Sequence, residues 1–149
     1  MRAVLQRVTY VRVFVDGKVV GEIGNGILAL LGFLPEDDEK TIDYILDKIV
    51  NLRIFEDTEG KMNRSLLDVS GELCIVPNFT LYGDARKGRR PGYSNAAAPN
   101  DAAAIYEQVV KTAEKLPLKT AFGVFQADMK VELLNDGPVT ILLDSEKLF

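Results

Sequence analysis

The stretch Asn135-Asp136-Gly137-Pro138-Val139-Thr140 lies between two segments that are typical of β-strands, Met129–Leu134 and Val139–Leu143. The Asp-Gly pair favours a tight connection, because glycine adopts a positive φ without a Cβ clash. Pro138 departs from an ordinary hairpin, since proline donates no backbone hydrogen bond and restricts the residue before it. A Gly-Pro bond is also one of the few peptide bonds whose cis form is accessible. Two interpretations follow: an ordinary surface turn, or a rigid, exposed backbone edge that contacts a ligand.

Outward from this stretch, the pattern predicts one α/β domain over residues 1–149, with a mixed, mostly antiparallel, barrel-like sheet and two main helices. Strands are expected at Ala3–Leu5, Val8–Val15, Lys18–Ile23, Ile27–Leu34, Arg53–Phe55, Leu73–Val76 and Thr120–Phe125. Apolar residues at helical spacing predict one helix that opens at Pro35–Glu39 and another over Asn100–Lys115. Residues 61–70 have no clear period and are expected to be irregular.

The absence of histidine narrows the possible chemistry most. The chain has no histidine and one cysteine, which excludes Ser-His-Asp and Cys-His catalysis and thiolate or imidazole metal sites. We therefore expect no metal and no cofactor. Cys74 lies in an apolar run and is expected to be a buried thiol. No signal peptide or bilayer-spanning run is indicated, so we expect a cytoplasmic protein with no membrane partner.

A cluster of cations is the clearest candidate for binding. Arg86, Lys87, Arg89 and Arg90 lie within five residues, with Tyr93 close behind. Glycines and Pro91 predict a loop, which could follow a phosphate backbone or simply be solvated. The net charge of −4 argues against binding nucleic acid by bulk charge, so a local patch of this kind would be required.

Four stretches together resemble the D-aminoacyl-tRNA deacylases, also called D-Tyr-tRNA deacylases. They are Gln6-Arg7-Val8; Arg53-Ile54-Phe55 through Gly60-Lys61-Met62-Asn63; Phe79-Thr80-Leu81 with Arg90-Pro91; and Ala127-Asp128-Met129 with Asn135 through Thr140. They span nearly the whole chain in the order and spacing of the family.

The resemblance implies a homodimer that hydrolyses the ester between a D-amino acid and the 3′ end of tRNA. Glycine misloaded on tRNA-Ala is an expected further substrate. In the family the Gly-Pro bond is cis and enters the pocket of the partner subunit. Carried over, the carbonyls of Gly137 and Pro138 would exclude an L side chain, and Arg7 would hold them in place.

The same resemblance assigns the remaining site residues. The backbone N–H groups of Phe79 and Thr80 would stabilise the oxyanion. Ala102, Phe125 and Met129 would line the pocket for the terminal adenosine. The 2′-hydroxyl of the tRNA is expected to assist hydrolysis, so we expect the Thr80 hydroxyl to position rather than to attack.

One departure from the family concerns the residues before Phe79. The family usually has Ser-Gln at this point, whereas this chain has Pro77-Asn78, so a serine hydroxyl is missing and the amide of Asn78 stands on a shorter arm. Two other functions therefore stay open: an RNA-binding module without catalysis, and a structural dimer in which Gly137-Pro138 serves assembly.

Overall fold

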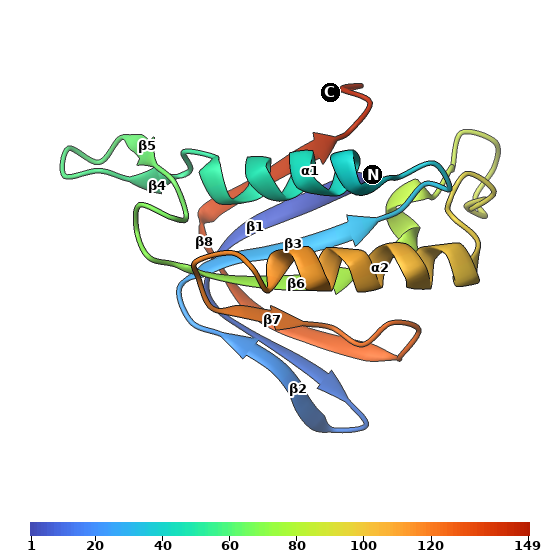
Figure 1. Ribbon diagram of the computed structural model, residues 1–149, viewed down its shortest axis with the longest axis horizontal. Helices are drawn as coiled ribbons and strands as arrows, with labels where there is room; N and C mark the ends of the chain where they lie inside the picture. Colours follow the sequence, from blue (N-terminus) through green and yellow to red (C-terminus); the bar gives the residue numbers. More distant parts are fainter.

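The computed structural model describes residues 1–149 and contains eight strands, two α-helices and one 3₁₀ turn (Figure 1). In chain order these are β1 (Arg2–Val15), β2 (Lys18–Ile23), β3 (Gly26–Gly32), α1 (Glu39–Asn51), β4 (Phe55–Glu56), β5 (Met62–Arg64), β6 (Glu72–Pro77), η1 (Phe79–Tyr82), α2 (Pro99–Ala113), β7 (Thr120–Phe122) and β8 (Met129–Asp144).

Six of the strands form one strongly curved sheet in the order β2-β1-β3-β6-β7, with β8 on the other edge of β1. The pairs that involve β1 are antiparallel, whereas β3–β6 and β6–β7 are parallel. The two outer strands of this path approach each other closely. A Cβ added to Gly21 in β2 would lie 2.9 Å from the carbonyl oxygen of Phe122 in β7. The expected mixed, barrel-like sheet is therefore confirmed.

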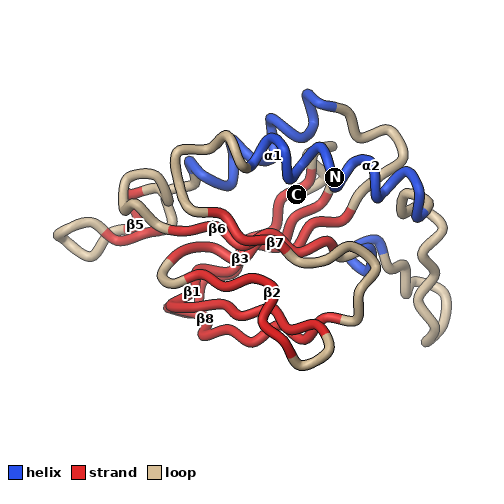
Figure 2. The backbone as a smooth tube through the Cα atoms, turned by 60° about the horizontal axis from the view of Figure 1, so that its bottom comes forward, coloured by secondary structure: helices blue, strands red, loops and turns tan.

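Both α-helices pack on one face of the sheet (Figure 2). Their apolar stripes meet the sheet in a core that includes Ile42, Ile45 and Ile49 of α1 and Ile105 and Val109 of α2. Helix α1 begins at Glu39, later than the expected opening near Pro35, because the Asp38 carboxylate caps it by accepting from the Thr41 N–H at 2.9 Å. The two expected helices are confirmed with these bounds.

A second, smaller core lies within the curve of the sheet. Its buried members are Val8, Val11, Val13, Ile23, Leu28, Cys74 and Val76. Burial raises the pKa of the Cys74 thiol to about 12, so the thiol is neutral at physiological pH. Cys74 is thus a buried, unpaired cysteine, as the sequence predicted.

The C-terminal half of the sheet differs from the expectation of two strands joined by a turn. Residues 129–144 form the single strand β8, which pairs with β1 on both sides of residues 136–139. Val8 pairs with Asn135 and Gln6 with Thr140, so residues 136–139 lie opposite Arg7 alone. The stretch around Gly137 is therefore an excursion from one strand rather than a hairpin turn. We call residues 136–139 the Gly-Pro segment.

Residues 55–64 also differ from the prediction, since β4 and β5 pair in a two-stranded hairpin where only a short strand followed by an irregular segment was expected. Asp57 holds its turn by accepting from the N–H groups of Glu59 and Lys61 and from the Asn63 side chain. These local side-chain bonds carry no hydrophobic period, which explains why the pattern of apolar residues did not reveal the hairpin.

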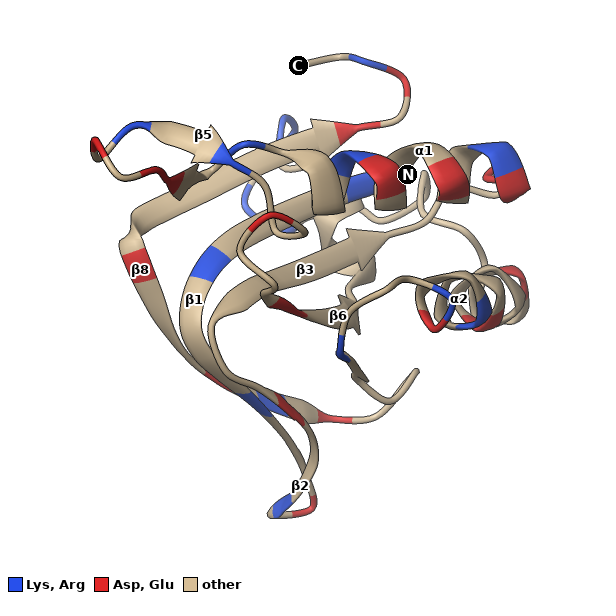
Figure 3. Cartoon of the chain, turned by 60° about the vertical axis from the view of Figure 1, so that its left-hand side comes forward, with Lys and Arg blue, Asp and Glu red and all other residues tan.

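Charged residues are frequent on the helices, the β4–β5 hairpin and the turns, whereas the covered strand β3 carries none (Figure 3). This matches a strand buried on both faces. No helix of the chain is long and apolar enough to cross a bilayer.

Candidate functional site

The principal cavity has a volume of about 910 Å³ and lies where η1, the start of α2 and the connection from β7 to β8 meet. Asn78, Phe79, Ala102, Phe125 and Met129, all predicted site residues, line it. The other lining residues are Phe33, Pro77, Tyr93, Ser94, Ala96, Ala97, Ala98, Pro99, Gln126 and Ala127. Its size and largely apolar lining suit a small organic group such as a nucleoside.

One wall of this cavity is the 3₁₀ turn η1, which Asn78 caps. The Asn78 Oδ1 accepts from the Thr80 N–H at 3.1 Å and from the Thr80 hydroxyl at 2.5 Å. The Phe79 N–H is the first of the turn and has no acceptor within it. Asn78 therefore already engages both donors of Thr80, and the Phe79 N–H is the donor that the turn leaves for a ligand.

The floor of the cavity is fixed from beneath by Tyr106, which the sequence did not single out. Its hydroxyl donates to the Gly123 carbonyl at 2.7 Å, and its ring stacks on Phe125 with centroids 6.1 Å apart. Burial raises the pKa of Tyr106, so its hydroxyl stays protonated and donating. The Val124 N–H also points at the Met129 sulfur, 3.3 Å away. Phe125 is thus held by Tyr106 of α2, and Met129 by the backbone of the turn that carries it.

The Gly-Pro segment is exposed except for the half-buried Val139, and its Gly137–Pro138 peptide bond is cis. Gly137 has a φ of 111°, a conformation that L side chains rarely adopt. A Cβ at this position would lie 2.7 Å from the Arg7 Nη2 and 2.9 Å from the Val139 Cγ2. Only glycine fits here without a shift of the neighbouring atoms.

Arg7 is buried beneath this segment, at 6% exposure. Its Nε forms an ion pair with the Asp136 Oδ2 at 3.1 Å, and its Nη1 donates to the Ile54 carbonyl at 2.7 Å. The guanidinium carbon also lies 6.0 Å from the centre of the Phe55 ring. A single arginine therefore joins the Gly-Pro segment to the chain that enters the β4–β5 hairpin.

Asn135 holds the other side of the segment and was not predicted as a site residue. Its side-chain Nδ2 donates to the carbonyls of Arg7 and Val139, both at 3.0 Å. The bond to Val139 bridges the two ends of the excursion. An asparagine at the edge of a Gly-Pro pair is a signal for such side-chain-to-backbone bonds, although the sequence does not say which carbonyls accept.

The Gly-Pro segment and the cavity of the same chain lie apart. Asn135 pairs with Val8, Val8 with Gly26, and Gly26 with Glu72 at the start of β6. The cavity instead begins at Pro77, five residues further along β6, or roughly 16 Å of strand. The structure thus separates the predicted residues that line the cavity from those at the Gly-Pro segment.

The predicted cations lie on residues 85–91, which we call the cationic loop. Asp84 and Gly92 close this loop with two backbone hydrogen bonds of 2.8 and 2.9 Å. Arg86 forks onto the Asp84 carboxylate, and this contact lowers the pKa of Asp84 below its usual range. Lys87, Arg89 and Arg90 form no ion pair within the chain. The loop therefore offers three uncompensated cations next to the cavity residue Tyr93.

Comparison with known proteins identifies a family that the chain matches. The family model described as D-Tyr-tRNA(Tyr) deacylase matches residues 4–144. The D-aminoacyl-tRNA deacylases of Thermosipho africanus and Clostridioides difficile are each 56% identical over 149 residues, covering 100% of this chain and of theirs. A solved structure of the c-Myc DNA unwinding element binding protein superposes with a TM-score of 0.90 at 39% identity, covering 97% of this chain and 98% of that one. A probable eukaryotic D-amino acid tRNA deacylase shares the fold, with a TM-score of 0.77 at 20% identity over 95% of this chain and 97% of that one.

Proposed function

The chain belongs to the D-Tyr-tRNA deacylase family, and from this premise we propose that it hydrolyses the ester bond of D-aminoacyl-tRNA, releasing the D-amino acid and free tRNA. The observation that carries the proposal furthest is the Gly-Pro segment, because an exposed backbone edge pinned by Arg7 and Asn135 has no evident structural purpose. Glycine esters carry no side chain and pass the same filter, so glycine misloaded on tRNA-Ala is a further proposed substrate.

Chirality is selected by exclusion. The carbonyl oxygens of Gly137 and Pro138 would face the α-carbon of the bound amino acid, where an L side chain collides with them and a D side chain points away. Because the selecting atoms belong to the backbone, many D side chains are accepted alike. Arg7 holds Asp136 before the pair and Asn135 holds the Val139 carbonyl after it, as an exclusion filter requires, since a mobile edge would yield to the L side chain.

The hydrolytic step suits a chain without histidine. Water, assisted by the 2′-hydroxyl of the terminal ribose, adds to the ester carbonyl carbon, and the tetrahedral intermediate then expels the ribose 3′ oxygen with a proton. The Phe79 N–H is the principal donor to the oxyanion, because Asn78 engages the Thr80 N–H. The Thr80 N–H joins it if the substrate displaces the cap. Ala102, Phe125 and Met129 receive the adenosine.

A second copy of the chain completes this site. The Gly-Pro segment is level with the start of β6 and the cavity with its end, so the segment cannot filter the substrate of its own cavity. Leu134 and Leu142, on either side of the segment in β8, are 53% and 54% exposed and would be covered by such a partner. We therefore propose a homodimer in which each chain supplies the filter of the other.

The deciding experiment follows the hydrolysis of matched D-Tyr-tRNA and L-Tyr-tRNA, with and without EDTA. We expect rapid loss of the D ester alone, at a rate that the chelator does not change. Hydrolysis of both esters would contradict the proposed chiral filter and indicate an esterase that does not distinguish D from L esters. Binding of tRNA without hydrolysis would favour the RNA-binding module, and reversion of Pro77 to Ser would then be the first repair to try.

Mixed dimers test whether the filter acts across chains. One copy would carry Ala102→Trp, which fills its cavity, and the other Gly137→Ala, which damages its filter. If each chain filters for its partner, the one open cavity meets an intact segment, and the mixed dimer rejects L-Tyr-tRNA as the wild type does. Hydrolysis of the L ester by the mixed dimer would place filter and cavity in the same chain. Circular dichroism of each variant checks that it folds.

A further inference from the structure

Two aromatic rings at the mouth of the cavity are unusually exposed. Phe79 is 58% and Tyr93 39% exposed, and their ring centroids lie 5.1 Å apart with the planes at 73°. Tyr93 is held from the other side by Gly83, where an added Cβ would lie 3.1 Å from its Cε1 atom. We call Phe79 and Tyr93 the aromatic pair. Large rings left in water but fixed in an edge-to-face contact are typical of a stacking surface.

The aromatic pair lies between the cavity and the cationic loop. The Asp84–Gly92 bridge closes that loop immediately before Tyr93, which itself lines the cavity. A single strand of nucleic acid whose last nucleoside occupies the cavity would therefore pass the pair before its phosphates reach Lys87, Arg89 and Arg90. A base platform beside a row of cations is the arrangement that binds single strands without reading their sequence.

We propose that the aromatic pair stacks the base of the nucleotide immediately 5′ of the terminal adenosine, while the cationic loop holds the phosphates that follow. The proposal rests on the proposed function and adds a second nucleotide to its substrate. Through this contact the enzyme binds the single-stranded end that is common to all tRNAs, independently of the attached amino acid. Affinity thus comes from a part of the substrate that is the same whichever amino acid is attached.

The test compares two minimal substrates, the D-tyrosyl ester of adenosine and the same ester of cytidylyl-adenosine. Stacking of one base predicts that kcat/KM of the wild type is roughly 5- to 100-fold higher on the dinucleotide. Tyr93→Ala should bring this ratio close to one, whereas Tyr93→Phe, which keeps the ring, should preserve it. Thermal unfolding of both variants checks the fold.

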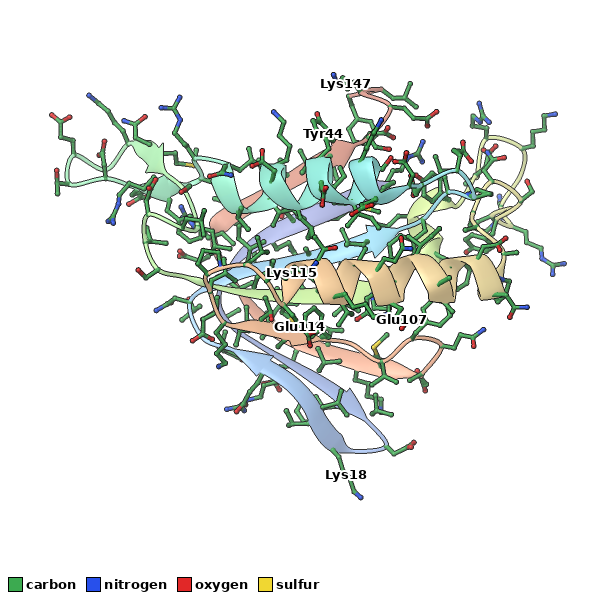
Figure 4. All side chains as sticks on the ribbon, in the orientation of Figure 1. Lys18, Tyr44, Glu107, Glu114, Lys115 and Lys147 are labelled. Atoms are coloured by element: carbon green, nitrogen blue, oxygen red, sulfur yellow. The ribbon has the colours of Figure 1, made fainter.

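Tyr44 provides a matched control, because it is another partly exposed tyrosine beside cations, with the Lys48 and Lys147 amines 5.8 and 5.7 Å from its ring centre. It lies on α1, beside Lys147 of the C-terminal segment and away from α2 (Figure 4). Tyr44→Ala should leave the ratio at the wild-type value.

The possible failures are distinguishable. A wild type that hydrolyses both esters at equal rates would overturn the stacking proposal and leave the deacylase function intact. An equal loss on both esters in Tyr93→Ala, with the ratio unchanged, would also overturn it, because Tyr93 would then serve the adenosine or the fold. A wild type that hydrolyses neither of these esters nor D-Tyr-tRNA would contradict the proposed function itself.

Discussion

The cavity and the Gly-Pro segment are built in opposite ways. The cavity is concave and its walls are side chains, drawn from η1, α2 and the connection between β7 and β8. The Gly-Pro segment is largely exposed and presents backbone, and its Asp136 side chain contacts the buried Arg7. On the proposed function, side chains would set how tightly the nucleoside end binds and the backbone would set which enantiomer reacts. Changes in one region should therefore alter a different kinetic quantity from changes in the other.

The largest effect should come from Gly137→Ala. The new Cβ would press on Arg7 and Val139 at a φ that alanine disfavours, so the carbonyl edge must shift. A displacement of about 1 Å at a reacting centre costs roughly 100-fold, and we expect the ratio of D to L kcat/KM to fall by about that factor. Time courses on both tRNA esters measure it. Gly17→Ala is the matched control, since Gly17 also has a positive φ but open space around it.

Arg7→Ala should have the next largest effect on the same ratio, because it removes the ion pair to Asp136 and the bond to the Ile54 carbonyl. We expect a loss of roughly 10- to 50-fold in discrimination, with a smaller change in KM. Arg12→Ala, on the exposed part of the same strand, should leave the ratio unchanged. Wild-type discrimination in Arg7→Ala would show that the segment holds its shape unaided.

Ala102→Leu should change the other quantity. Ala102 is buried at the start of α2 and lines the cavity, so a larger side chain takes the space of the adenosine. We expect KM to rise about tenfold, which corresponds to roughly 1.4 kcal/mol of lost binding, while the D to L ratio stays constant. Ala104→Leu, on the exposed face of α2, is the control. A changed ratio in Ala102→Leu would break the proposed division between the two regions.

The smallest effect should come from Thr80→Ala. The Thr80 hydroxyl donates to Asn78 and nothing in the structure activates it as a nucleophile. Loss of one exposed hydrogen bond is worth about 1 kcal/mol, so we expect kcat to fall less than about tenfold. Complete inactivity in a variant that folds and still binds tRNA would assign the hydroxyl a chemical role instead.

The sequence predicted the helices and strands better than the way in which they connect and pair. Apolar periodicity located both helices and most strands, because those patterns follow directly from burial. It divided β8 in two, since no local pattern reveals that both halves pair with one strand more than a hundred residues earlier. The hairpin at residues 55–64 was missed for a similar reason, as side-chain bonds from Asp57 hold it.

The site was predicted unevenly for related reasons. The resemblance supplied the residues that line the cavity, and the structure gathers five of them there. Tyr106 was not found, because a buried tyrosine on an apolar helix face looks like any core residue until its hydroxyl is seen to bind Gly123. The sequence also could not show that Asn78 accepts from both donors of Thr80, because these hydrogen bonds depend on the backbone conformation of η1.

The pairing of β1 with β8 has a consequence for the order of events during synthesis. Arg2 pairs with Asp144, so β1 can complete its pairing only after β8 has been made. Contacts between such distant residues slow folding, because the entropy cost of closing the long loop comes before the contacts form. Until then the edge of β1 stays open, and Arg7 has no Gly-Pro segment to hold. The proposed filter can therefore form only after β8 has been made, and a chain that lacked β8 would lack the Gly-Pro segment on which the proposed discrimination between D and L amino acids depends.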